Sequence, residues 1–228
     1  LPVSQILNNF KEKNVLDIGC GNGIYYNLLK EIFKHNLKTY TGFDKNLRID
    51  EKIKSIKNTN FIQDDVSQIK KYLKNHNFII SQSFIEHIKY DLKFFENLKY
   101  FEDANIPSIQ IHLFPSNPCL YLYLAHGIRH YNLGSISKIS RIYSNQKTKK
   151  LLISLGSKNI NLLHFKELTL KRLFRSKNLI EKGELDLFHS KFLDSFNKDC
   201  NANKKNKINN AAFYALILQT NLKKEIEF

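Results

Sequence analysis

The chain has 228 residues, of which 42% are hydrophobic and 25% charged, as in ordinary globular domains and unlike disordered chains. No stretch approaches 18 consecutive apolar residues, so no membrane-spanning helix is predicted. The formal net charge of +15 would suit a polyanion, but only five of the 36 basic residues are Arg, the side chain best suited to paired phosphate and guanine contacts. We therefore favour lysine-rich solvated faces over a nucleic-acid footprint, and nucleic acid stays an open alternative.

The cysteines argue against disulfide and metal chemistry. Cys20, Cys119 and Cys200 lie far apart and form no CxxC pair. Neither a disulfide framework nor a zinc or iron–sulfur site is therefore predicted, and a reducing cytoplasm fits three separate thiols best. The chain begins at Leu1 and contains no Met, so we expect that its natural start has been removed.

The first half alternates short apolar runs with helical patterns, which is typical of a parallel sheet with helices on its faces. The expected strands are Asn14–Ile18, Thr39–Phe43, Asn60–Gln63, Phe78–Ser81 and Ser108–Leu113. The expected helices are Tyr25–His35, Leu47–Lys57, Ser67–Asn75 and Glu86–Tyr100. This pattern predicts a Rossmann-like, doubly wound α/β fold whose cofactor-binding half spans residues 1–113.

The second half has a weaker pattern. Residues 114–119 contain two prolines and are expected to form a loop. Further helices are expected over residues 121–129, 135–154 and 165–178, and a lysine-rich loop over 197–210. The apolar run Ala211–Thr220 is predicted to be a buried strand that closes the sheet. We therefore expect one domain, with a largely helical substrate-side insertion over residues 114–210 and the closing strand within 211–228.

The strongest motif is Val15-Leu-Asp-Ile-Gly-Cys-Gly-Asn-Gly23, where an apolar strand leads into an acidic residue and three alternate glycines. Such glycines permit a positive φ and a close approach to the backbone, at the strand ends where parallel sheets bind ligands. A P-loop would need Lys and then Ser or Thr after the glycines, and a dinucleotide fingerprint would need Gly or Ala at Ile24. A glycine turn that binds nothing is the remaining alternative.

The pattern Asp17-x-Gly19-x-Gly21-x-Gly23 resembles the first motif of the class I S-adenosylmethionine-dependent methyltransferases, and further matches follow in order to Leu113. The resemblance implies that S-adenosylmethionine is the cofactor, that Asp44 accepts the ribose hydroxyls and that Asp65 meets the adenine amino group. The implied cofactor-binding residues are Asp17, Gly19, Cys20, Gly21, Gly23, Asp44, Asp65, Ser81 and Gln82. Helix capping is the structural alternative for Asp44 and for the adjacent Asp64 and Asp65.

The pair Glu86-His87 follows the fourth expected strand and is similar to the pair in many small-molecule members of that family, including quinone-biosynthesis O-methyltransferases. His87 is the expected general base, because an unperturbed imidazole titrates near pH 6.5. Glu86 would orient that imidazole, assist in binding a divalent cation or begin a helix. A purely structural histidine at a helix start is the alternative for His87.

A second polar cluster, His126, Arg129 and His130, follows the fifth expected strand and is the candidate acceptor site. The i, i+4 spacing of the two histidines could suit a metal ion, but Gly127 lies between them and no acidic residue is near, so no metal site is predicted. A surface helix packed against the insertion is the alternative.

The sequence therefore predicts an enzyme that methylates a small-molecule or glycan-precursor acceptor, at oxygen. The Asn/Asp-Pro-Pro-Tyr signature of adenine amino methylases is replaced by Ser81-Gln-Ser-Phe84, which argues against that kind of base modification. An RNA or protein methyltransferase that uses the basic insertion and a non-catalytic binding module are the alternatives.

Overall fold

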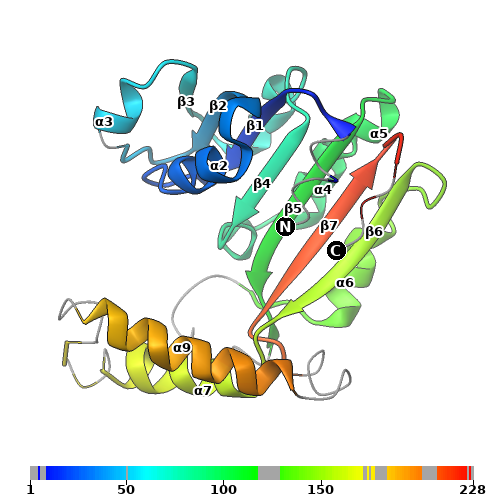
Figure 1. The fold of residues 1–228 in the computed structure, drawn as a ribbon. Coiled ribbons are helices and arrows are strands. Elements are labelled where there is room, and N and C mark those ends of the chain that lie inside the picture. Colours follow the sequence, from blue (N-terminus) through cyan, green and yellow to red (C-terminus); the bar gives the residue numbers. More distant parts are fainter. Residues whose placement is uncertain are drawn as a thin grey trace.

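The computed structural model describes residues 5, 9–49, 51–117, 129–171, 174, 176–177, 184–201, 210–224 and 226. Within these residues, seven strands form one sheet in the order β3-β2-β1-β4-β5-β7-β6 (Figure 1). The strands are β1 (Lys13–Ile18), β2 (Leu37–Asp44), β3 (Thr59–Gln63), β4 (Phe78–Gln82), β5 (Ser108–Pro115), β6 (Thr148–Leu155) and β7 (Phe213–Thr220). Strands β1 to β5 are parallel, and β7 runs antiparallel to both β5 and β6. The predicted doubly wound α/β fold is confirmed.

Helices pack on both faces of this sheet. One face is covered by α2 (Tyr25–Phe33), which is followed by the 3-10 turn η1 (Lys34–Asn36), and by α3 (Glu51–Lys54). The other face carries the 3-10 helix η2 (Val66–Tyr72), the 3-10 turn η3 (Ile85–His87), α4 (Asp91–Leu98), α5 (Tyr100–Asp103) and α6 (Leu133–Ser140). The central strands therefore have helices over both of their surfaces, as parallel sheets require.

The alternation of side chains along each strand explains this two-sided core. In β1, Val15 enters the cluster under α2, and Leu16 enters the cluster on the opposite face. In β4, Phe78 belongs to the first cluster and Ile79 to the second. Because successive strand residues point to opposite faces and both faces are buried, these strands are continuously apolar.

A helical pair lies beyond the carboxyl ends of β4 and β5 (Figure 1). It consists of α7 (Lys158–His164), which continues into the π-helical stretch η5 (Phe165–Leu170), and α9 (Leu185–Cys200). The carboxylate of Asp199 in α9 accepts the backbone N–H groups of Ser157 and Ile160 at 2.6 and 3.1 Å. Asp199 thus caps the start of α7 and joins the two helices.

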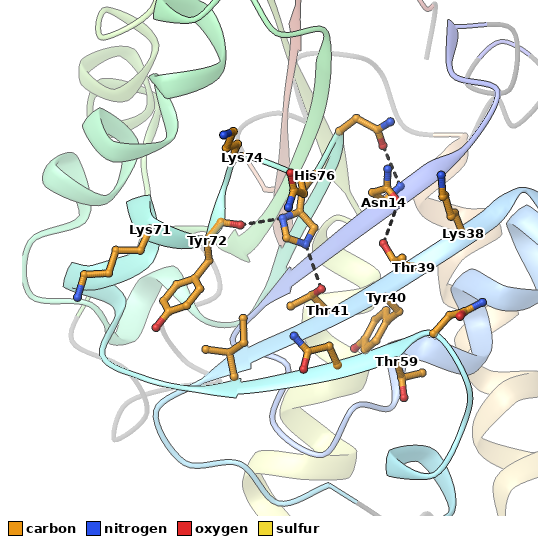
Figure 2. Close-up of a pocket in the computed structure, with 15 residues that line it drawn as sticks. Asn14, Lys38, Thr39, Tyr40, Thr41, Thr59, Lys71, Tyr72, Lys74 and His76 are labelled. Carbon is orange, nitrogen blue, oxygen red and sulfur yellow. Dashed lines mark hydrogen bonds between the residues drawn. The ribbon is translucent and has the colours of Figure 1, made fainter.

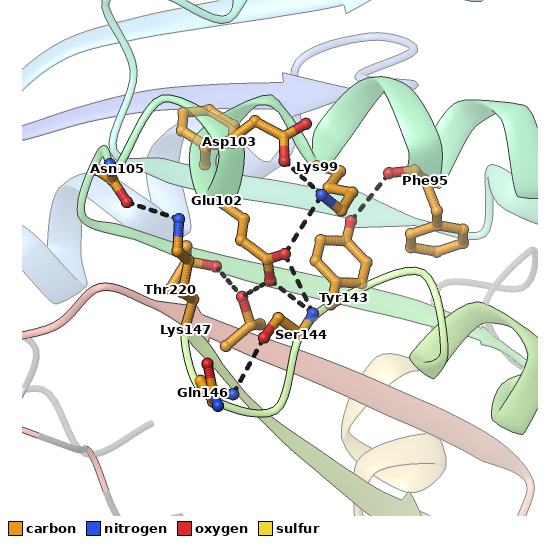
Figure 3. Close-up of polar contacts among 12 residues, drawn as sticks. Phe95, Lys99, Glu102, Asp103, Asn105, Tyr143, Ser144, Gln146, Lys147 and Thr220 are labelled. Carbon is orange, nitrogen blue, oxygen red and sulfur yellow. Dashed lines mark hydrogen bonds and ion pairs between the residues drawn. The ribbon is translucent and has the colours of Figure 1, made fainter.

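A buried carboxylate joins the connection between α6 and β6 to the first half of the chain. Glu102 in α5, only 3% exposed, accepts the backbone N–H of Ser144 at 2.9 Å and the hydroxyl of Thr148 at 2.6 Å (Figure 3). The ammonium group of Lys99 lies 3.4 Å from the same carboxylate. Since these donors satisfy its charge, Glu102 fixes the start of the edge strand β6 against α5.

The expected helix over residues 135–154 is wrong after α6, because Thr148–Leu155 forms β6. The alternate residues Leu151 and Ile153 pack against the core, which is the period of a strand. The expected loop over 114–119 is also wrong at its start, since β5 ends only at Pro115. A proline is tolerated there because the ladder stops at that residue.

Several other expected boundaries differ. The expected helix Glu86–Tyr100 is divided, because the turn before α4 is held by Arg129, which donates to the carbonyl of Lys89 at 2.7 Å. In place of the expected helix 67–75 the structure has the 3-10 helix η2, which ends at Tyr72, and residues 47–57 contain only the short α3. Helix α7 begins before the expected helix 165–178, and α9 extends into the expected loop 197–210. Residues 121–128 lie outside the described residues. None of the described helices has the length and apolar character needed to cross a membrane.

Candidate active site

The loop after β1 adopts a backbone that requires glycine. Gly19, Gly21 and Gly23 have φ values of +79°, +54° and +77°, a region that residues with side chains rarely adopt. The N–H groups of Gly19 and Cys20 donate to the carbonyl of Phe43 at 2.7 and 3.2 Å, which fixes the loop to the end of β2.

The glycines differ in what surrounds them. A Cβ atom on Gly19 would overlap the ring of Phe84, so this glycine allows Phe84 to pack on the loop. Around the corresponding position of Gly21 no atom lies within 4 Å, and the space is open. The exposed backbone at Gly21 is therefore the part of the loop that a ligand can approach.

Asp44 lies at the end of β2 and contacts this loop. Its Oδ2 accepts the N–H of Gly21 at 2.9 Å, and its Oδ1 accepts the N–H of Asn46 at 2.8 Å. Each carboxylate oxygen can accept a second hydrogen bond, so both stay able to bind a ligand hydroxyl. Turn capping and ligand binding are thus compatible at this residue.

Asp65 follows β3 and caps η2, which was the alternative to its predicted contact with adenine. Its carboxylate accepts the N–H of Ser67 at 3.0 Å and lies 3.3 Å from the ammonium group of Lys45. The pKa of Asp65 is lowered, and the hydrogen bond from the Ser67 backbone is the largest cause. The preceding Asp64 accepts a hydrogen bond from the Tyr72 hydroxyl at 2.8 Å. Asp65 is half exposed and accessible, whereas Asp64 is held by Tyr72.

Two of the predicted cofactor residues are buried beneath the loop. Asp17 is 1% exposed and accepts a hydrogen bond from the Tyr40 hydroxyl at 2.5 Å. Burial raises the pKa of Asp17 to about 7, although the Tyr40 hydrogen bond opposes this shift. Burial also raises the pKa of the Cys20 thiol. Both side chains therefore support the loop from below.

The end of β4 places its last two side chains differently. Ser81 is completely buried, and its hydroxyl lies 2.8 Å from Nδ1 of His112 in β5. Burial lowers the pKa of His112 to about 3, so this imidazole is neutral. Burial raises the pKa of Tyr25 at the start of α2, and the half-buried side chain of Gln82 opposes that rise. Of the two residues, Gln82 is therefore the one that lies near Tyr25, which follows the glycine loop.

A cleft of about 570 Å³ brings the predicted site residues of four segments together. Its lining includes Gly19, Asp44, Asp65, Phe84 and His87. Sequence reasoning missed Phe84, whose placement depends on the positive φ of the preceding Ser83 (+46°). A non-glycine residue with this backbone is uncommon and carries no clear sequence signal.

The side chains of Glu86 and its neighbour His87 point in different directions. It is 3% exposed, and its Oε2 has no hydrogen-bond partner among the described residues. Burial raises the pKa of Glu86 to about 7. The lining of the cleft includes His87 and not Glu86, so the two side chains diverge within the η3 turn.

Of the predicted acceptor residues, Arg129 lies at the η3–α4 turn. Arg129 forms an ion pair with Asp91, Nη1 to Oδ1, at 2.5 Å, and Tyr131 donates to the same carboxylate at 3.0 Å. Neither Arg129 nor His130 lines the cleft, and burial lowers the pKa of His130. Arg129 thus holds a turn that borders the cleft, and His126 lies outside the described residues. Across the described ranges, no three His, Cys, Asp or Glu side chains gather as a possible metal site.

The strand order, the glycine loop and the carboxylates at the ends of β2 and β3 define an α/β fold with a cleft at the carboxyl ends of its parallel strands. Residues 2–140 match the model of a family described as "methyltransferase domain". The chain belongs to this family, as a class I S-adenosylmethionine-dependent methyltransferase, and it is therefore an enzyme. No curated protein matches it by sequence.

Solved structures share the fold at low sequence identity. The plantazolicin methyltransferase BamL, in complex with a triazolic desmethylPZN analog and SAH, is 16% identical with a TM-score of 0.60, over 96% of this chain and 81% of that one. The methyltransferase domain of bacterial CtHen1-CN is 14% identical with a TM-score of 0.56, over 95% of both chains. A SAM-dependent methyltransferase from Archaeoglobus fulgidus is 16% identical with a TM-score of 0.52, over 96% of this chain and 91% of that one.

Proposed function

We propose that this enzyme methylates an oxygen atom of a small-molecule or glycan-precursor acceptor, with His87 as the general base. The observation that supports this most strongly is that His87 lines the same cleft as Gly19, Asp44 and Asp65. A general base must lie within hydrogen-bond reach of the proton that it removes. A shared cleft allows His87 to meet an acceptor hydroxyl beside the cofactor.

The residues of the cleft fit S-adenosylmethionine. The space at the Cβ position of Gly21, which does not itself line the cleft, is open to a ligand that approaches the loop. The two oxygens of Asp44 fit a pair of ribose hydroxyls. The half-exposed carboxylate of Asp65 fits an amino group such as that of adenine. The bound cofactor supplies a methyl carbon on a positively charged sulfur.

The roles of the other predicted site residues follow from their positions in the structure. Asp17 and Cys20 support the loop from beneath, and Gln82 lies near Tyr25, which follows the loop. The Ser81 hydroxyl hydrogen-bonds His112 inside the sheet, so Ser81 is not among the proposed cofactor-binding residues. Glu86 acts as a positioning residue for the η3 turn, since its buried side chain lies away from the cleft.

The experiment is a transfer assay with cofactor that carries a deuterated methyl group. The protein is incubated with a panel of hydroxylated metabolites and sugar precursors, and separately with short RNAs and peptides. Mass spectrometry then locates the label. The expected result is a deuterated methyl group on an oxygen atom of a small molecule. Label found only in RNA or peptide, or only on nitrogen, would contradict the proposal.

RNA is the second candidate acceptor, because a depression lined by lysines opens near the amino ends of β1, β2 and β3, opposite the cleft. It has a volume of about 850 Å³, and its lining includes Lys38, Lys71, Lys74 and His76 but no acidic residue (Figure 2). Lys71 and Lys74 form no ion pair with another described residue, whereas Lys38 pairs with Glu12 at 2.5 Å. A phosphate chain would suit this surface.

Its position argues against a direct function in methyl transfer. Thr39 lines the depression near the start of β2, and Asp44 lies at the end of the same strand. Asp44 is five residues further along the strand, or roughly 16 Å away. RNA held there would reach the cleft only around the edge of the sheet. A steep loss of RNA binding with salt and labelled RNA as the product would support this candidate.

A further inference from the structure

A second, smaller cavity lies between the ends of the central strands and the helical pair α7 and α9. Its volume is about 320 Å³, and its lining includes Gln82, Ile160, His164, Phe192, Phe196 and Phe213. We propose that this cavity binds the methyl acceptor through a flat aromatic ring, which narrows the acceptor class. The proposal rests on the methyl transfer argued above.

The walls of the cavity are apolar and flat. Phe192 and Phe196 lie one turn apart in α9, with ring planes 11° apart and centroids separated by 6.3 Å. Phe196 is 43% exposed although it is apolar, and buried Ile160 lines the cavity from α7. An aromatic ring that packs against these side chains gains contact energy beyond simple burial. The volume is at the lower end for ligand sites, which suits a small molecule.

Two polar side chains are prominent among the described residues that line this cavity, Gln82 and His164. The Nδ1 atom of His164 is buried and has no hydrogen-bond partner in the described part of the chain. Burial lowers the pKa of His164, so the ring is neutral and offers one donor and one acceptor. A ring with one polar substituent inside the cavity would satisfy it, with the hydroxyl that accepts the methyl group outside the cavity and within reach of His87. A sugar would leave several hydroxyls without partners at a cost in binding.

Gln82 connects this cavity to the glycine loop. In the sheet Ile18 pairs with Ser81, so Gly19 and Gln82 follow at the same carboxyl edge. The Gln82 side chain lines the cavity and lies near Tyr25, just after the loop, where it opposes the rise that burial causes in the pKa of Tyr25. A ring bound in the cavity therefore lies beside the loop at which the methyl donor is placed.

The two helical walls are held together at both ends. Asp199 in α9 caps α7, and Lys191 in α9 forms an ion pair with Glu167 in η5 at 2.8 Å. The π-helical stretch begins directly after His164, and such stretches are frequent at functional sites. The cavity is thus a preformed site, which reduces the ordering cost of binding.

The test measures binding with 2-naphthol, a flat aromatic with one hydroxyl, in the presence of S-adenosylhomocysteine. Ligand-observed NMR and calorimetry are applied to the full chain, with methyl glucoside as the sugar probe. We expect saturable binding of 2-naphthol and none of methyl glucoside. Phe196→Ala should weaken 2-naphthol binding about tenfold. Leu193→Ala is the matched control, because Leu193 is 58% exposed on the same helix and does not line the cavity.

The outcomes separate this inference from the proposed function. If S-adenosylhomocysteine binds but 2-naphthol does not, or if methyl glucoside binds equally well, the aromatic pocket is wrong and methyl transfer stands. If S-adenosylhomocysteine itself does not bind, the proposed function fails. His164→Asn, which leaves both phenylalanines in place, should also weaken 2-naphthol binding severalfold. A Phe196→Ala variant that only changes the oligomeric state in sedimentation would identify the surface as a contact with a second copy and overturn the proposal.

Discussion

The carboxylate of Asp44, at the end of β2, accepts the backbone N–H of Gly21 in the loop after β1 at a distance of 2.9 Å. The residue that we propose for ribose binding therefore also shapes the loop against which the cofactor is placed. A substitution at Asp44 removes a ligand contact and a loop contact together, and conservative and non-conservative changes should differ.

Asp44→Asn keeps one oxygen acceptor, whereas Asp44→Ala keeps none. We expect the dissociation constant of S-adenosylhomocysteine to rise about tenfold in the first variant and about 100-fold in the second, because hydrogen bonds to a charged group are worth roughly 1.5–3 kcal/mol. Calorimetry measures both. Asp64→Asn is the control, since Asp64 bonds Tyr72 outside the loop. Unchanged affinity in Asp44→Ala would refute the ribose contact.

The two glycines of the loop should respond differently to alanine. Gly21→Ala meets no atom within 4 Å, so only the positive φ opposes it, at about 1–2 kcal/mol of unfolding free energy. Gly19→Ala adds an overlap with the Phe84 ring and should cost clearly more. Chemical denaturation compares them, and Phe84→Gly combined with Gly19→Ala should recover the steric part, because the Cβ of Phe84 also lies 2.6 Å from the Cβ position of Gly19. Equal costs for the two single variants would show that Phe84 does not pack on Gly19.

Asp17 should make stability fall with rising pH. Burial raises its pKa from 3.8 to about 7, so between these values the folded protein holds a proton that the unfolded chain has lost. The free energy of unfolding therefore decreases as pH rises through this window and levels off above about pH 7. Asp17→Asn keeps an acceptor for the Tyr40 hydroxyl and should flatten this part of the curve. Urea denaturation at several pH values measures the slope.

Glu86 has the same raised pKa of about 7 and contributes in the same direction, so Asp17→Asn alone leaves part of the slope. Glu86→Gln should remove the rest of the pH dependence of the free energy of unfolding. A slope that neither substitution changes would contradict the burial of both carboxyl groups.

His87→Ala should slow methyl transfer by roughly 10²–10⁴ if the imidazole is the general base, and should leave S-adenosylhomocysteine affinity unchanged. The loss should be greatest near neutral pH and smaller at high pH, where the acceptor hydroxyl ionises without help. His35→Ala is the control, because His35 is exposed in η1, away from the cleft. Full activity in His87→Ala would eliminate this assignment.

Glu102→Ala should lower the free energy of unfolding by about 3 kcal/mol, because it leaves the buried donors of Ser144 and Thr148 without their acceptor. Glu96→Ala is the matched control, since Glu96 is 52% exposed and pairs only with Lys93 at the surface. Thermal or urea unfolding measures both. Equal losses in the two variants would mean that the Glu102 network does not join β6 to α5.

The sequence by itself determined the features that depend on a few neighbouring residues. The expected strand Asn14–Ile18, observed as Lys13–Ile18, the turn at Gly19, Gly21 and Gly23, and the position of Asp44 at the end of the second strand all follow from local apolar runs and glycine conformations. The parallel sheet follows from their alternation with helices. For this reason the fold and the family were predictable without coordinates.

Only the tertiary structure decided which side chains meet. Sequence adjacency could not show that Ser81 faces His112 inside the sheet whereas Gln82 faces Tyr25, because that depends on which face each helix covers. The strand β6 depends on pairing with β7, more than 50 residues further along the chain, and a local helical pattern cannot reveal such a partner. Long-range contacts are set by packing and burial across the whole chain, and short sequence patterns encode only the backbone preferences of their own residues.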